Sequence, residues 1–113
     1  MSPITPAQDH SEALRQIRNE IPKFGVSRIH ELHGAFKHYR DLMHHIITIE
    51  EYKVASYLSQ HTPFIDHHIL HALNTKNLNE KKEAFDTAVT NLVLDIDYLL
   101  GIIGFMKAQK AIA

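Results

Sequence analysis

The segment FDTAVTNLVLDIDYLLGIIGFM, residues 85–106, decides the fold of this chain. Its apolar residues recur at alternating spacings of four and three, which is the period of one face of an α-helix. The members of this series are Phe85, Val89, Leu92, Ile96, Leu99, Ile103 and Met106. We therefore predict one long helix over 85–106 that forms the spine of the protein.

The same segment carries a second apolar stripe on another face of the helix. This stripe consists of Leu94, Tyr98, Gly101 and Phe105. A small monomer rarely covers two apolar faces of one helix, so the stripe has two interpretations. In one, the other segments wrap around a central helix. In the other, the stripe is a self-association surface of a homodimer or larger homo-oligomer, where Gly101 and Gly104 permit close approach.

A second ridge with the same helical period lies between residues 29 and 46 and predicts another long helix from about Ser27. It consists of Ile29, Leu32, Phe36, Tyr39, Met43 and Ile46. Upstream, Pro6 follows a threonine that can cap a helix, which predicts a helix from there to about Glu20, ended by Pro22 and Gly25. Residues 1–6 are then a flexible tail.

Two breaks are expected between these ridges. The series fails at Thr48, where TIEE (48–51) is typical of a capping box, so we predict a turn there and a third helix over Glu50–Gln60. Thr62 and Pro63 would open a fourth helix that ends near Asn74, before a polar loop over 74–79. The sequence thus predicts an all-α fold, an antiparallel bundle of four to five helices in one domain over 1–113.

Composition excludes several classes of function. Twelve Lys and Arg against thirteen Asp and Glu give no basic excess, so we expect no nucleic-acid partner. The absence of cysteine excludes disulfides and thiolate metal sites. The N-terminus lacks a signal pattern and the longest apolar run, 99–106, is too short to cross a bilayer, so we expect a cytoplasmic protein without a membrane partner.

Ten of the 113 residues are histidine. Because imidazole titrates near pH 6.5, protonating all ten would move the net charge from -1 to about +9, so the surface can sense pH or bind metal. On a helical wheel the 29–46 ridge places His33 at its edge. The outward positions are His30, His38, His44 and His45.

One histidine pair has the spacing of metal ligands. His67 and His71 lie one turn apart on the predicted outer face of their helix, where two imidazoles can chelate zinc, nickel or copper. A tight site for a divalent transition metal needs further ligands, which His61, Asp66 or His68 could supply through the predicted turn at 62–63. The alternative is a solvated polar face.

Asp95 borders the most apolar ridge, and a buried carboxylate needs a partner. We expect a hydrogen bond or ion pair with His33, Arg40 or Tyr39 on a facing helix. The alternative is a ligand-binding or proton-accepting role for the carboxylate.

The stretch HELHGA at 30–35 resembles the signature of histidine phosphotransfer domains. That resemblance implies an exposed phospho-acceptor at His30, a buried Leu32, and a glycine, Gly34, that clears space for a response regulator. The sequence departs from the family at His33, where a lysine is usual.

Two further stretches resemble metal and nuclease families. The residues similar to parts of the hemerythrin di-iron pattern are Glu50, Glu51, His67, His71, Asp95 and Tyr98. Thr90, however, occupies the place of a ligand histidine in that pattern. Arg40 and His45 resemble the Arg-x4-His motif of the HEPN ribonucleases, but residues five apart on a helix point about 140° from each other.

No phosphate-binding loop, nucleophile elbow or paired-carboxylate motif is present in the sequence. We therefore expect a small non-enzymatic helical protein that acts through association with a protein partner, including itself. Two alternatives stay open: a phosphotransfer module that uses His30, and a metal-binding bundle that holds di-iron, zinc or nickel.

Overall fold

The computed structural model describes the backbone of residues 6–50 and 56–112, with side chains described within 10–48 and 56–109. Four α-helices account for most of it: α1 (Pro6–Glu20), α2 (Ile29–Glu50), α3 (Ser56–Asn74) and α4 (Leu78–Ile112). Two short 3-10 helices, Ile21–Lys23 and Val26–Arg28, join α1 to α2. The described residues contain no strand, so the all-α prediction is confirmed.

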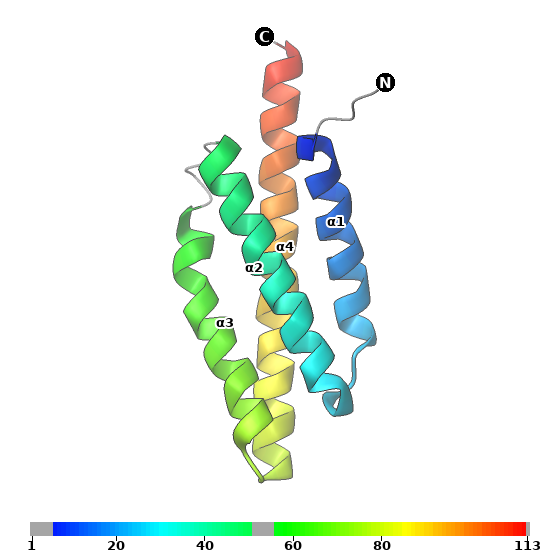
Figure 1. The fold of residues 1–113 in the computed structure, drawn as a ribbon, viewed down its shortest axis with the longest axis vertical. Helices are drawn as coiled ribbons and strands as arrows, with labels where there is room; N and C mark the ends of the chain where they lie inside the picture. Colours follow the sequence, from blue (N-terminus) through cyan, green and yellow to red (C-terminus); the bar gives the residue numbers. More distant parts are fainter. Residues whose placement is uncertain (1–5, 51–55, 113) are drawn as a thin grey trace.

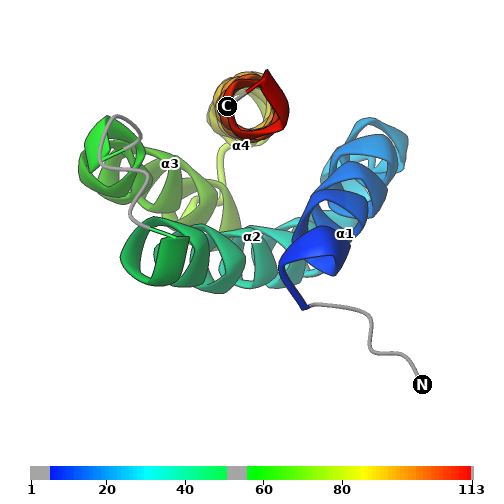
Figure 2. The same ribbon diagram turned by 90° about the horizontal axis from the view of Figure 1, so that it is seen from above.

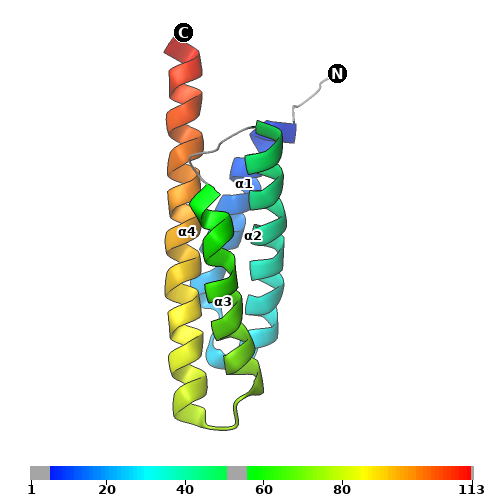
Figure 3. The same cartoon turned by 90° about the vertical axis from the view of Figure 1, so that its left-hand side faces the viewer.

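The helices lie side by side along the long axis of the molecule (Figure 1). Seen from above, α4 lies opposite α2, while α1 and α3 flank it on either side (Figure 2). The C-terminal turns of α4 extend beyond the ends of the other helices (Figures 1 and 3). One side of α4 therefore faces the interior, and the opposite side has no helix over it.

Both predicted ridges face the core. Every member of the 29–46 series is buried, and Tyr39 and Phe36 are the largest fully buried side chains. In the 85–106 series Val89 and Met106 pack partly buried against the core, and the other five members are buried. Burial of apolar surface at about 25 cal/mol per Å² makes this shared seam the main source of stability.

The predicted break at Thr48 is wrong. α2 continues through Thr48 to Glu50, so this threonine lies inside a helix rather than at a cap. The predicted third helix was to begin at Glu50, which is instead the last residue of α2, and residues 51–55 lie outside the described residues. The apolar series ends at Ile46, whereas the helix continues to Glu50. The end of the apolar face therefore did not mark the end of the helix.

The predicted break at Thr62 and Pro63 is also wrong, because α3 runs through both. Pro63 has no N–H to donate to the carbonyl of Ser59, four residues earlier. The hydroxyl of Thr62 donates to that same carbonyl at 2.9 Å. A side-chain hydrogen bond thus replaces the missing backbone bond, and residues 56–60 and 63–74, predicted to lie in two helices, belong to a single α3.

The loop before α4 is shorter than predicted and spans residues 75–77. The side chain of Asn77 accepts a hydrogen bond from the backbone N–H of Glu80 at 3.0 Å, which is an N-cap contact. Lys81 donates from Nζ to the carbonyl of Ala72 at 2.6 Å and so ties the start of α4 to the end of α3. Because of this cap, α4 begins at Leu78, inside the predicted 74–79 loop and ahead of Phe85, the first residue of the apolar series.

The replacement of a backbone bond by Thr62 predicts coupling between two substitutions. Thr62→Val should lower the free energy of unfolding by about 1 kcal/mol, since it leaves the Ser59 carbonyl without a donor. Pro63→Ala should raise it by about 1–3 kcal/mol because it restores the N–H. In the Pro63→Ala background, Thr62→Val should be nearly neutral. Urea unfolding of the four proteins tests this, and an equal cost of Thr62→Val in both backgrounds would contradict it.

Candidate functional site

A polar and aromatic cluster lies between α3 and α4 around Asp95. The Asp95 side chain is almost fully buried, and its Oδ2 lies 2.5 Å from Nδ1 of His61 on α3. The hydroxyl of Tyr57 lies 3.5 Å from Oδ1, at the long limit of a hydrogen bond. The burial of Asp95 agrees with the sequence analysis, but its partner is not among the three expected residues.

The aromatic rings of α3 hold His61 in place. Its imidazole lies between Tyr57, with ring centroids 5.9 Å apart, and Phe64, at 5.2 Å, nearly parallel to both. Tyr98 of α4 contacts Tyr57 edge to face at 5.5 Å. We call Tyr57, His61, Phe64, Asp95 and Tyr98 the α3–α4 cluster. With both faces of the imidazole against rings and Nδ1 against a carboxylate, the orientation of His61 is fixed.

Burial dominates the electrostatics of this cluster. Desolvation raises the pKa of Asp95 above its ordinary value of 3.8, and the contacts with His61 and Tyr57 oppose that rise. Desolvation also raises the pKa of Tyr39, a fully buried residue of α2, and the nearby Asp95 charge adds to this effect. The Tyr39 hydroxyl has no hydrogen-bond partner among the described residues. Burial therefore favours the neutral form of the Asp95 carboxyl and of the Tyr39 phenol, since it raises the pKa of both groups.

Sequence reasoning missed the pairing of His61 with Asp95. The predicted turn at Thr62–Pro63 separated His61 from the residues after it, so its helix face could not be assigned. On a continuous helix, Tyr57, His61 and Phe64 follow spacings of four and three and share one face. That spacing was the available signal.

The wheel assignments of the other histidines are confirmed. His30, His38, His44 and His45 are exposed. His33 is half-buried at the edge of the ridge, and its Nε2 lies 3.5 Å from Asp66. Most of the α2 histidines therefore lie on the surface, where each adds a positive charge when it is protonated.

The five candidate metal ligands do not converge on one point, although the rings of His67 and His68 contact each other edge to face at 5.4 Å. Four of them have separate partners: His61 with Asp95, Asp66 with His33, His68 with the Phe64 carbonyl at 2.9 Å, and His71 with Glu80 at 3.3 Å.

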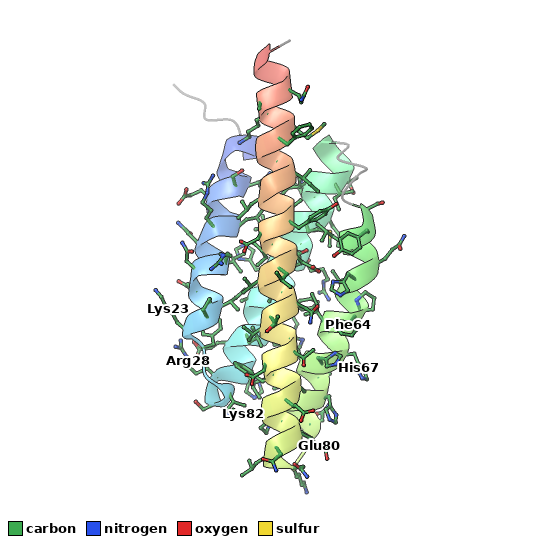
Figure 4. The ribbon with its side chains drawn as sticks, turned by 180° about the vertical axis from the view of Figure 1, so that it is seen from behind. Lys23, Arg28, Phe64, His67, Glu80 and Lys82 are labelled. Atoms are coloured by element: carbon green, nitrogen blue, oxygen red, sulfur yellow. The ribbon has the colours of Figure 1, made fainter. Side chains whose placement is uncertain are left out.

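The fifth candidate, His67, is exposed on the outer side of α3, away from Glu80 (Figure 4). Within the described side chains, no group of three or more His, Asp or Glu is placed to hold a metal ion. The metal site stays a prediction without support from this arrangement.

The residues that carry the partial family resemblances also lie in different surroundings. His30 lies in the first turn of α2, where it helps to line a groove of about 370 Å³ with Leu73 and Lys81. Gly34 is exposed and has open space where a Cβ would stand. Arg40 lies over the ring of Phe36. The phosphotransfer prediction stays untested.

The residues of the di-iron and ribonuclease patterns do not share one environment. The His45 ring contacts that of His10 at 4.8 Å, whereas Arg40 lies against Phe36. Asp95 is engaged by His61, on the inner side of α3. The side chains of Glu50 and Glu51 lie outside the described residues.

The predicted second stripe of α4 is exposed. Leu94, Tyr98 and Phe105 have exposed fractions of 60%, 44% and 61%, and Gly101 is exposed between them. A groove of about 320 Å³ runs along this side of the helix. Its lining consists of Asp97, Tyr98, Gly101, Ile102, Phe105 and Met106. This outer face of α4 is turned toward the viewer in Figure 4.

One described helix, the Leu78–Gln109 part of α4, is long and apolar enough to cross a membrane, judged by length and composition alone. The count of uninterrupted apolar residues in the sequence did not detect it. The core helix of a soluble protein passes the same test, so this is weak evidence for a membrane. Asp97 in this segment forms a two-pronged pair with Arg18 of α1 at 2.9 and 3.3 Å.

Comparison with protein families, curated proteins and solved structures gave no significant match to this chain. Two features of the molecule itself bear on its function: the α3–α4 cluster and the outer face of α4.

The raised pKa of Asp95 predicts a pH dependence of stability. A group whose pKa is higher in the folded state contributes stability that is complete below its unfolded pKa, here about 3.8, and lost as pH rises through the folded value. As pH rises above about 3.8, wild type should thus lose stability relative to Asp95→Asn, by about 1.4 kcal/mol for each tenfold difference in proton affinity between the folded and unfolded states.

Urea unfolding at several pH values measures this difference. Asp86→Asn, which changes an exposed aspartate on the same helix, is the matched control and should follow wild type. Parallel pH profiles of wild type and Asp95→Asn would contradict the raised pKa.

The separation of the candidate ligands predicts weak zinc binding. Two exposed imidazoles give a weak site, so calorimetric titration with zinc should yield a dissociation constant above about 100 µM. His67→Gln should behave like His44→Gln, a change at an exposed histidine on another helix. Submicromolar binding that His67→Gln alone abolishes would overturn this.

Proposed function

We propose that this protein is a non-enzymatic helical protein that acts through protein–protein association, with the outer face of α4 as its contact surface and a second copy of the chain as the partner. The observation that supports this is the exposure of three large apolar side chains, Leu94, Tyr98 and Phe105, on one stripe of a helix whose opposite side forms the core. Contiguous apolar surface of this kind is typical of interaction sites.

The charges around this face favour a protein partner over a bilayer. The carboxylate of Asp97 lines the groove, and it would have to leave water if lipid covered this side of the helix. Against a protein surface it keeps its pair with Arg18 at the rim. A net charge of -1 at pH 7 also means that two copies repel each other weakly.

We extend this proposal to the architecture of the protein and to its location in the cell. The four helices form one antiparallel bundle and a single domain, because the short connection at 75–77 reverses the chain between α3 and α4. The protein acts in the cytoplasm, without nucleic acid or membrane. The exposed histidines make its surface charge, and with it the repulsion between copies, sensitive to pH.

Self-association through α4 is tested by one substitution and a matched control. Leu94→Glu places a charge in the proposed contact and should weaken association at least tenfold, about 1.4 kcal/mol. Leu78→Glu makes the same change at an exposed leucine in the first turn of the same helix, outside the stripe, and should leave association unchanged.

Sedimentation equilibrium from about 10 µM to about 1 mM measures the mass of the three proteins. The expected result is a concentration-dependent dimer for wild type and for Leu78→Glu. A strict monomer over the whole range would overturn the proposed function.

A further inference from the structure

The exposed stripe of α4 has a symmetrical spacing. Its members are separated by four, three and four residues, from Leu94 to Tyr98, to Gly101, to Phe105. Read from either end, the stripe presents a large apolar residue at the outside and has its midpoint between Tyr98 and Gly101. Between these two ends, Tyr98 carries a large ring and Gly101 carries no side chain.

We propose that two copies pack α4 against α4 in antiparallel orientation, about a twofold axis between Tyr98 and Gly101. In this register the ring of Tyr98 fills the space beside Gly101 of the partner subunit, and Leu94 contacts Phe105 of the partner subunit. Twofold dimers use one self-complementary patch on both chains, which this spacing provides. The inference rests on the proposed function and adds the register of its interface.

The space beside Gly101 supports this register. Gly101 lines the groove of about 320 Å³ beside Tyr98 and Phe105, and a Cβ built at Gly101 would meet no other part of the described chain within 4 Å. Phe105 lies one turn further along the same exposed side, with 61% of its surface free. The outer face of α4 is also uncovered, since α1 and α3 flank the helix and α2 lies behind it (Figure 2).

A parallel arrangement fits the same residues less well. It would place Tyr98 against Tyr98 of the partner subunit and leave the two glycines facing each other across a void. Mismatched packing of this kind costs stability at the ring pair and again at the void. Antiparallel packing instead pairs the ring with the glycine at both positions.

The charge at the edge of the contact is compatible with the same register. Asp97 lines the groove beside the proposed axis and forms its two-pronged pair with Arg18 in the same chain. Two copies of Asp97 close to a twofold axis would otherwise repel each other. The pairing within each chain lowers that cost.

Cross-linking tests the register directly, because the chain has no cysteine of its own. Leu94→Cys and Phe105→Cys chains are prepared separately, mixed in equal amounts and treated with a short bis-maleimide. The antiparallel register predicts a cross-linked species with the mass of one chain of each kind, and little cross-linking of either chain with itself. Cross-linking of Leu94→Cys chains with one another would contradict it and indicate parallel packing.

Exchanging the ring at Tyr98 with the open position at Gly101 gives a second test of the register. Gly101→Phe should weaken association at least tenfold, because the new ring meets Tyr98 of the partner subunit, while Gly34→Phe at another exposed helical glycine with open space should not. Combining Gly101→Phe with Tyr98→Ala exchanges the two positions and should restore association to within about threefold of wild type, clearly tighter than Gly101→Phe alone. Circular dichroism confirms that each variant is folded.

The outcomes separate this inference from the proposed function. A dimer that Leu94→Glu weakens, but that cross-links Leu94→Cys chains with themselves or shows no rescue in the swapped variant, keeps the function and overturns the antiparallel register. A monomeric wild type overturns both.

Discussion

The geometry of α4 is the constraint on which the rest of the structure depends. This helix is apolar on two sides, and the described residues of its own chain cover only one of them. Tyr39, Phe36 and the rest of the 29–46 ridge meet its inner face. The outer face keeps Leu94, Tyr98 and Phe105 exposed, with an open glycine among them. The helices α1, α2 and α3 are shorter than α4, which extends beyond them, so they leave part of its apolar surface uncovered (Figure 3). We propose that a second molecule covers this surface.

The inner and outer faces of α4 meet at the α3–α4 cluster. Asp95 brings a carboxylate into the core, where desolvation would be costly without His61. The stacking of Tyr57 and Phe64 on that imidazole fixes its orientation, and the ring of Tyr57 lies nearly perpendicular to that of Tyr98 on the exposed stripe. The His61–Asp95 pair thereby helps to position Tyr57 and, through it, Tyr98 at the border of the proposed interface. This cluster links the core of the chain to its contact surface.

Periodicity predicted the parts of the fold that depend on one continuous apolar face. The 29–46 ridge and the spine helix were correct, and the exposed stripe of α4 was recognised as a second face. Periodicity failed where local capping decides the outcome: Thr62 supplies a hydrogen bond that keeps α3 intact past Pro63, and Asn77 caps α4 well before Phe85, the first residue of its apolar series. The partner of Asp95 was missed for the same reason, since His61 could be placed only on an unbroken helix.

The central claim is that the outer face of α4 is a contact between two copies of this chain. An isotope-filtered NMR experiment on a sample that mixes labelled and unlabelled chains tests it most directly, because it records only contacts between molecules. The account predicts cross-peaks from the ring protons of Tyr98 to the α-protons of Gly101 of the partner subunit. Intermolecular cross-peaks confined to residues of α1, α2 or α3, or none at all in a concentrated sample, would contradict it.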